Sequence, residues 1–158
     1  MSLVEQLKSV DRGKFKGVEH YKPSDVAPVL IALVDLDDES CNENIYNQAL
    51  FAIGNNHGGT YYLAFQEALN FILISAVEGS SEVSRSCALE MLTDIHCAFV
   101  PELTQEIFHL YDKLQSDVKK EVKEFYPKLL ELADLKDESQ RNRKLACDLI
   151  EFIRDPEC

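Results

Sequence analysis

One segment of this chain, residues 55–62, gathers the side chains best suited to chemistry. It reads Asn-Asn-His-Gly-Gly-Thr-Tyr-Tyr, and its candidate binding residues are Asn55, Asn56, His57, Thr60, Tyr61 and Tyr62. An imidazole can act as a base or as a ligand, and neighbouring amides and phenols can hydrogen-bond to it. Catalysis would also require a nucleophile or a second titrating group, but the segment contains no Cys, Asp or Glu. We therefore favour a structural role for His57 and predict no catalytic residue.

The glycines of the same segment predict a loop that leads into a helix. Gly58 and Gly59 permit backbone angles that other residues avoid, and Thr60 is suited to cap the N-terminus of the following helix. We expect one of Tyr61 and Tyr62 to enter the core and the other to face solvent. An exposed tyrosine at this position would suit a protein interface.

A second cluster of polar groups lies at residues 35–40, which read Asp-Leu-Asp-Asp-Glu-Ser. Its carboxylates are further binding candidates: Asp35, Asp37, Asp38 and Glu39. Closely spaced carboxylates can bind calcium, but the glycine and the final bidentate glutamate of an EF-hand loop are missing. The histidines and cysteines show no zinc spacing, so the sequence predicts neither a metal nor a cofactor. Two interpretations of the cluster stay open, a solvent-exposed turn and a contact with a basic partner.

Charge is distributed unevenly along the chain. In total, 28 acidic and 16 basic residues give a net charge of −12. Residues 23–84 contain nine acids and no Lys or Arg, whereas the other residues carry 19 acids and 16 bases. A negative field repels phosphate backbones, which disfavours nucleic acid as a partner, and it attracts a basic protein. The alternative is that the acidity only keeps the protein soluble.

Helical periodicity dominates the sequence. Apolar residues recur at three- and four-residue spacings through residues 26–53 and again through residues 65–95. Polar segments at 35–44 and 78–81 predict the turns within these two helix pairs, with Gly79 ending one helix and Ser81 capping the next. Cys87 and Cys147 lie within apolar helical patterns and are expected in the core. No strand-like alternation interrupts the series, which predicts an all-α protein.

The helical pattern continues beyond residue 100 with a less certain register. Pro101 is expected to start a helix that carries Leu103, Ile107, Phe108, Leu110 and Leu114. Ser116 or Asp117 is expected to cap a further helix. Pro127 either begins a new helix or kinks a longer one.

The helix pairs are related to one another in sequence. A shift of 39 residues overlays Leu30 on Leu69, and a second echo matches residues 28–40 to residues 127–139 at eight of thirteen positions. Helix pairs repeated at about 40 residues are typical of a HEAT- or armadillo-like α-α superhelix of antiparallel helix pairs. An irregular helical bundle is the alternative. We expect one domain over 1–158, with an N-terminal cap segment at 1–22, two repeats at 24–98 and further helices at 101–154.

Three short motifs follow the order found in bacterial HEAT-repeat proteins. They are Leu-Lys-Ser-Val-Asp at 7–11, Ser-Asp-Val-Ala-Pro-Val-Leu at 24–30 and His-Gly-Gly-Thr-Tyr-Tyr at 57–62. The last resembles the family's His-Gln-Gly-Thr-Val-Tyr-like stretch, and the resemblance extends over residues 3–103. The chain departs from the family at Gly58 in place of Gln, at Leu63 in place of Pro and at Arg12 in place of an aromatic residue. The resemblance implies an α-solenoid and brings no established activity.

The combined pattern favours a non-enzymatic, protein-binding helical-repeat module with a basic partner. A concrete version is an immunity or antitoxin protein that covers the cationic cleft of a toxin. The alternatives are a lyase- or hydrolase-like enzyme that uses the His57 loop, and a structural adaptor or self-associating scaffold. The first residues lack the zones of a secretion signal, and no apolar run approaches the roughly 18 residues that span a bilayer. We therefore expect a cytoplasmic protein without a membrane partner.

Overall fold

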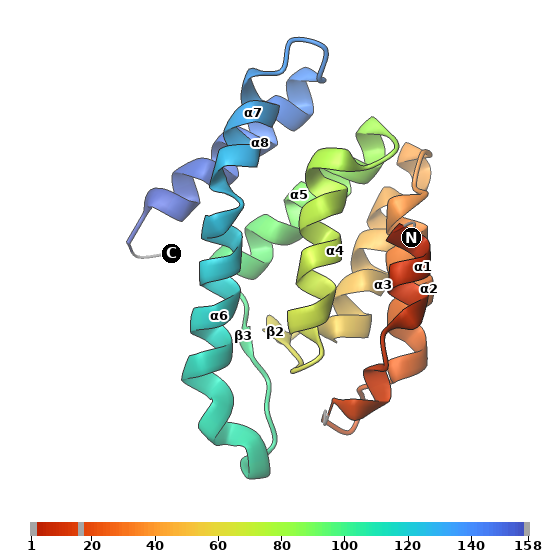
Figure 1. Cartoon of the computed structure of the whole chain (residues 1–158), viewed down its shortest axis with the longest axis vertical. Helices are drawn as coiled ribbons and strands as arrows, with labels where there is room; N and C mark the ends of the chain where they lie inside the picture. The colour runs from red at the N-terminus through yellow and green to blue at the C-terminus, as the bar shows by residue number, and fades with distance from the viewer. Residues whose placement is uncertain (1–2, 16–17, 157–158) are drawn as a thin grey trace.

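Antiparallel helix pairs in two layers form most of the chain (Figure 1). The computed structural model describes residues 3–15 and 18–156. The ends of the predicted 1–158 domain, residues 1–2 and 157–158, lie outside the described residues. The same holds for residues 16–17 of the predicted N-terminal segment.

The described chain is mostly helical, which confirms the predicted all-α class. Its α-helices are α1 (Leu3–Ser9), α2 (Pro23–Val34), α3 (Asn42–Ile53), α4 (Phe65–Glu78), α5 (Glu82–Cys97), α6 (Tyr111–Glu124), α7 (Tyr126–Asp134) and α8 (Gln140–Arg154). Short 3-10 helices occur at η1 (Arg12–Lys14), η2 (Glu39–Cys41) and η3 (Gln105–Leu110). Two-residue strands occur at β1 (Gly54–Asn55), β2 (Thr60–Tyr61) and β3 (Val100–Pro101).

The two layers follow from the order of the helices. Helices α2 and α4 and the run from α6 to α7 form one layer, and α3, α5 and α8 form the other (Figure 1). Within each pair, α2 packs against α3, α4 against α5 and α7 against α8. Because α5 also contacts both α3 and α8, it is the central helix of the second layer.

Burial is deepest in the middle pair. Helix α4 buries eight of its 14 residues, whereas α6, of equal length, buries Leu114, Val118 and Val122. The difference arises because α4 has neighbours on several sides and α6 presents one narrow apolar stripe. Cys87 on α5 is buried as predicted, and burial raises the pKa of its thiol to about 12. The prediction for Cys147 is wrong, because it lies on the exposed face of α8.

The predicted turn between α4 and α5 is confirmed in detail. Gly79 is the C-cap of α4, and its N–H donates to the Ser75 carbonyl at 3.0 Å. The Ser81 hydroxyl caps α5 by accepting from the Ser84 N–H at 3.0 Å. This bond satisfies one of the amides that a helix start leaves without a partner.

The region after α5 differs from the sequence prediction. Pro101 belongs to β3 instead of starting a helix, and helical structure resumes at η3. Ser116 and Asp117 lie inside α6 and cap nothing. Pro127 begins a new helix, because it occupies the first turn of α7, where a missing N–H costs no hydrogen bond. Phe125 closes α6 and opens α7, so the two helices follow each other directly.

Candidate functional site

The loop at residues 55–62 is part of a small three-stranded sheet, which corrects the expectation that no strand interrupts the helices. Strand β1 pairs with β2 in antiparallel fashion, and β2 pairs with β3 in parallel. The Val100 N–H donates to the Gly59 carbonyl at 3.0 Å, and the Glu102 N–H donates to the Tyr61 carbonyl at 2.8 Å. Two-residue strands are too short for alternation to appear in the sequence, so periodicity could not reveal them.

Two glycines make this tight pairing possible. A Cβ atom on Gly54 would lie 2.0 Å from the Thr60 carbonyl oxygen, so only glycine fits there. Gly59 has a φ angle of +63°, which confirms for this residue the predicted need for glycine conformational freedom. The same prediction is wrong for Gly58, because Gly59 alone among the described glycines has a positive φ.

The polar side chains of the loop bind the scaffold. Thr60 donates its hydroxyl proton to Glu102, and Asn56 Nδ2 donates to Asn47 Oδ1 at 2.8 Å. Asn55 Oδ1 accepts from the Gly58 N–H at 3.1 Å. The predicted N-cap at Thr60 is wrong, because Ala64 occupies the N-cap position of α4. These bonds hold the loop in place through three of its polar side chains.

Neither tyrosine of the loop faces solvent, so the prediction of one exposed tyrosine is wrong. Tyr61 and Tyr62 are 1% and 3% exposed. The Tyr61 ring packs on Phe65, with centroids 5.0 Å apart, and Tyr62 meets Tyr21 edge-on at 5.7 Å. Burial raises the pKa of both phenols, so they stay protonated and cannot serve as bases. Their role here is packing.

His57 is exposed at the tip of the loop. Its ring meets the Phe51 ring edge-on at a centroid distance of 4.9 Å. Among the described residues no carboxylate or thiol is hydrogen-bonded to the imidazole, so no catalytic pair is assembled around it. The hydrogen bonds that hold the loop pass through its Asn and Thr side chains instead.

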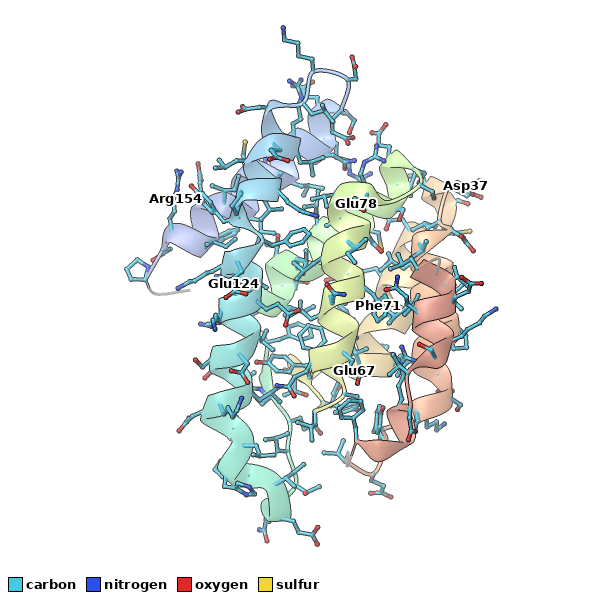
Figure 2. The ribbon with its side chains drawn as sticks, viewed as in Figure 1. Asp37, Glu67, Phe71, Glu78, Glu124 and Arg154 are labelled. Carbon is cyan, nitrogen blue, oxygen red and sulfur yellow. The ribbon has the colours of Figure 1, made fainter. Side chains whose placement is uncertain are left out.

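The acidic turn at residues 35–40 lies at the opposite end of α3 from the loop. Twelve helical residues separate the two, about 18 Å of helix, so the fold does not join the two candidate sites. Asp35, Asp37, Asp38 and Glu39 are all exposed, and Asp37 lies at the right-hand edge of the molecule in Figure 2. The Ser40 hydroxyl and N–H both donate to Asp38, and these bonds lower the pKa of Asp38.

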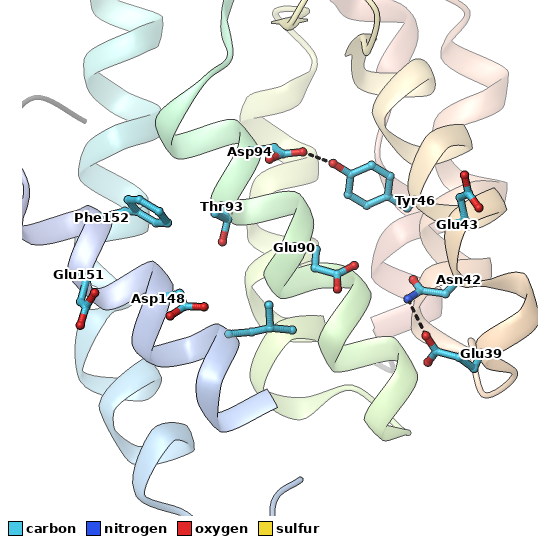
Figure 3. Close-up of a pocket in the computed structure, with 11 residues that line it drawn as sticks. Glu39, Asn42, Glu43, Tyr46, Glu90, Thr93, Asp94, Asp148, Glu151 and Phe152 are labelled. Atoms are coloured by element: carbon cyan, nitrogen blue, oxygen red, sulfur yellow. Dashed lines mark hydrogen bonds between the residues drawn. The ribbon is translucent and has the colours of Figure 1, made fainter. Parts of the chain in front are cut away.

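Glu39 connects this turn to a groove between α3, α5 and α8, which we call the acidic groove. The groove has a volume of about 640 Å³, and eleven residues line it (Figure 3). Six of them are acids and none is Lys, Arg or His. The acids are Glu39, Glu43, Glu90, Asp94, Asp148 and Glu151.

The centre of the acidic groove combines apolar and polar groups. Tyr46 on α3 points toward Asp94 on α5 and donates its phenolic proton to that carboxylate (Figure 3). Burial raises the pKa of Tyr46 and the bond to Asp94 raises it further, so the phenol remains a donor. Leu145 and Phe152 of α8 add apolar surface to the same groove. The groove can therefore receive an apolar body with a positively charged end.

Two cations of α8 reach the edge of the groove. Arg141 bridges Glu39 and Glu90, and Lys144 pairs with Asp148 at 2.8 Å. Hydrogen bonds from Arg141 lower the pKa of Glu39. Within the described structure, Glu43 and Glu151 take part in no ion pair, so the groove keeps an excess of negative charge.

Sequence analysis missed most of the groove. Glu39 and Glu43 stand in the base-free segment, but the acids of α5 and α8 come from outside it. In the sequence, these acids of α5 and α8 appear only as polar residues spaced three or four apart, as in Glu90 and Asp94, opposite the apolar face of each helix. Such a spacing predicts a solvent-facing stripe, and it does not tell which stripes meet across a groove.

Comparisons with family models, curated proteins and solved structures found no match to this chain. Among the described residues, no group of three or more His, Cys, Asp and Glu side chains is arranged to hold a metal ion. In the same part of the chain, no helix is long and apolar enough to cross a membrane. The geometry of the acidic groove therefore carries the functional proposal.

Proposed function

We propose that this chain is a non-enzymatic, HEAT-like helical-repeat module that binds a basic partner protein in the acidic groove. The observation that carries the proposal is the lining of the groove, six carboxylates with no cation among eleven residues. Three helices from three successive pairs contribute to it, as expected when repeats are stacked side by side. A surface built in this way offers a long, fixed row of side chains to a partner.

The electrostatics of the groove favour a partner that is positively charged. Carboxylates on both sides of a concave surface add their fields and speed the approach of a cationic protein. Tyr46, Leu145 and Phe152 supply the apolar contact that long-range attraction lacks. Phe152 is 37% exposed, so its ring is available to a partner without a change of fold.

A toxin with a cationic cleft is the concrete partner that we favour, with this chain as its immunity or antitoxin protein. The net charge of −12 and the acidic groove together match the surface of a nucleic-acid-cleaving enzyme, whose substrate is itself an anion. The His57 loop supports the enzyme alternative less well, because no carboxylate or thiol among the described residues is hydrogen-bonded to His57. The loop's Asn55, Asn56 and Thr60 are hydrogen-bonded to other residues of the fold.

Charge reversal inside and outside the groove tests the proposal. The groove variant carries Glu43→Lys and Glu151→Lys, and the matched control carries Asp112→Lys and Glu131→Lys on α6 and α7. Both variants change the net charge by the same amount, and all four positions are exposed. Binding of the basic proteins lysozyme and cytochrome c is measured by calorimetry for the wild type and both variants.

We expect the groove variant to lose about tenfold or more in affinity and the control to lose about twofold, because close charges act more strongly than screened distant ones. Raising the salt concentration should weaken binding to the wild type. Equal losses in the two variants, or binding that salt does not change, would overturn the proposal. Circular dichroism checks that both variants keep their helix content.

A further inference from the structure

One end of the acidic groove already holds a guanidinium group, that of Arg141. From α8, Arg141 Nη1 lies 2.7 Å from Glu39 Oε1, and its Nη2 lies 3.0 Å from Glu90 Oε1. The two carboxylates belong to different parts of the fold, the turn before α3 and the middle of α5. The fold thus places two carboxylates at the spacing that the two ends of one guanidinium require.

Asn42 adds an acceptor to this end of the groove. Asn42 is 7% exposed and lines the groove. Its side chain points from α3 into the groove (Figure 3). Asn42 Nδ2 donates to Glu39 Oε1 at 3.4 Å, whereas Asn42 Oδ1 has no hydrogen-bond partner. A buried acceptor without a donor is costly, so a ligand that brings an N–H group to it gains free energy.

The three acceptors match arginine better than lysine. A guanidinium group carries five N–H donors in one plane, whereas an ammonium group is a compact charge with three. Arg141 directs one nitrogen to each glutamate. Arg141 does not bond the remaining acceptor, Asn42 Oδ1. A second guanidinium in the same site could donate to this oxygen as well as to the two glutamates.

We propose that this end of the acidic groove is a binding site for an arginine side chain of the partner, and that Arg141 occupies the site in the free chain. The proposal rests on the function proposed above. Arg141 has a side chain 42% exposed, and exposed ion pairs contribute little stability, so it can swing out while the fold stays intact. The incoming guanidinium then bonds Glu39, Glu90 and Asn42.

Removing Arg141 tests the site with a defined probe, a hexa-arginine peptide blocked at both ends. Arg141→Ala should bind this peptide about 5- to 10-fold more tightly than the wild type, because the competing group is gone. Lys144→Ala is the matched control, since Lys144 is also an exposed cation of α8 and pairs with the groove acid Asp148. We expect it to change the affinity by less than about twofold.

A hexa-lysine peptide separates recognition of guanidinium from attraction to the general charge. The Arg141→Ala variant should prefer hexa-arginine to hexa-lysine, and Asn42→Ala in that background should reduce the preference. Equal gains from Arg141→Ala and Lys144→Ala would overturn the inference, because the effect would then come from net charge. So would an equal affinity of Arg141→Ala for both peptides.

The outcome for basic proteins distinguishes the two proposals. If lysozyme or cytochrome c binds the groove but the Arg141→Ala variant gains nothing for hexa-arginine, the arginine site is wrong and the proposed function stands. If the charge-reversed groove variant binds basic proteins as well as the wild type, the proposed function itself fails. Arg141→Gln keeps a polar side chain without the positive charge and should behave as Arg141→Ala does.

Discussion

Two turns of this molecule share most of their sequence and differ in what covers them. Residues 28–40 and 127–139 agree at eight of thirteen positions, and each segment ends a helix and leads into the next. In the first turn Leu36 is 5% exposed and Glu39 is open to solvent. In the second turn the equivalent Leu135 is 50% exposed, whereas Glu138 is 7% exposed. The first turn therefore buries its leucine and exposes its glutamate, whereas the second turn exposes its leucine and buries its glutamate.

The turn between α4 and α5 explains the exchange, because it lies between the other two and offers each a different group. On one side, the hydroxyls of Ser80, Ser81 and Ser84 donate to the carbonyls of Val34, Leu36 and Leu33. On the other side, Arg85 Nε lies 2.7 Å from Glu138 Oε2. Local sequence thus sets where a helix ends, and the neighbouring element decides which residue of the turn is buried.

The equivalent glutamates of the two turns each pair with an arginine, but at different depths in the protein. Glu39 pairs with Arg141 at the surface, and Glu138 pairs with Arg85 where both side chains are largely covered. Glu138 accepts further bonds from the Ser139 N–H and from Asn142 Nδ2, each at 3.0 Å. An exposed pair of this kind contributes little stability, whereas breaking a buried one leaves an unpaired charge inside the protein.

The largest effect is expected from removing the buried glutamate. Glu138→Ala should lower the free energy of unfolding by about 2–4 kcal/mol, because Arg85 loses its carboxylate partner in a covered position. Glu39→Ala, the equivalent change in the exposed turn, should cost less than about 1 kcal/mol. Urea unfolding followed by circular dichroism measures both. Similar losses in the two variants would contradict the assigned difference in burial.

A smaller difference should appear in the dependence of stability on pH. Burial alone would raise the pKa of Glu138, but hydrogen bonds from Arg85, the Ser139 N–H and Asn142 together lower it below its ordinary value of 4.5. A lowered pKa stabilises the fold above the unfolded value, and this contribution disappears as the pH falls through the folded value. The stability gap between wild type and Glu138→Gln should therefore narrow from pH 6 to pH 3.

The matched variant for the pH series is Glu39→Gln. Hydrogen bonds from Arg141 also lower the pKa of Glu39, but its exposed carboxylate stays in contact with solvent. Its stability gap to the wild type should be smaller than that of Glu138→Gln at every pH. Chemical unfolding at each pH gives both gaps, and a gap for Glu138→Gln that stays constant would contradict the assigned pKa direction.

The smallest effect on stability is expected from making the first turn resemble the second. Asp37→Lys copies Lys136, the equivalent residue of the other turn, at an exposed position. The free energy of unfolding should change by less than about 0.5 kcal/mol, because the side chain contacts mainly solvent. Thermal unfolding checks this, and a loss above 1 kcal/mol would show that the first turn is less tolerant than its exposure indicates.

The sequence predicted the elements that depend on short-range patterns. The first two helix pairs follow from apolar spacing, and the cap at Ser81 follows from the residue type. The strands around Gly54 and Val100 were not predicted, because each contains only two residues, and β3 also pairs with a strand 40 positions earlier in the chain. Tyr61 and Tyr62 are consecutive residues, and the fold has covered both, which neither helical nor strand periodicity predicts.

For the acidic groove, the sequence predicted a negative charge but neither the position of the groove nor most of its lining residues. The base-free segment indicated a negative surface in the first half of the chain, and Glu39 and Glu43 do face the groove. Asp148 and Glu151 join them through the packing of α8 on α5. That packing depends on contacts between residues more than 50 positions apart, such as Asn142 of α8 with Glu82 of α5, and a single sequence carries no direct record of such contacts.

The parallel pairing of β2 with β3 has a consequence for how the protein opens. Thr60 lies beside Val100, so residues 60–100 form a ring that is closed by main-chain hydrogen bonds and contains α4 and α5. Once the ring opens, the intervening chain regains the entropy that closure removed, and the two helices lose the anchor that fixes their ends. Detachment of β3 and loss of the middle helix pair should therefore occur as one cooperative event. The small sheet therefore holds together the two ends of the segment that contains α4 and α5.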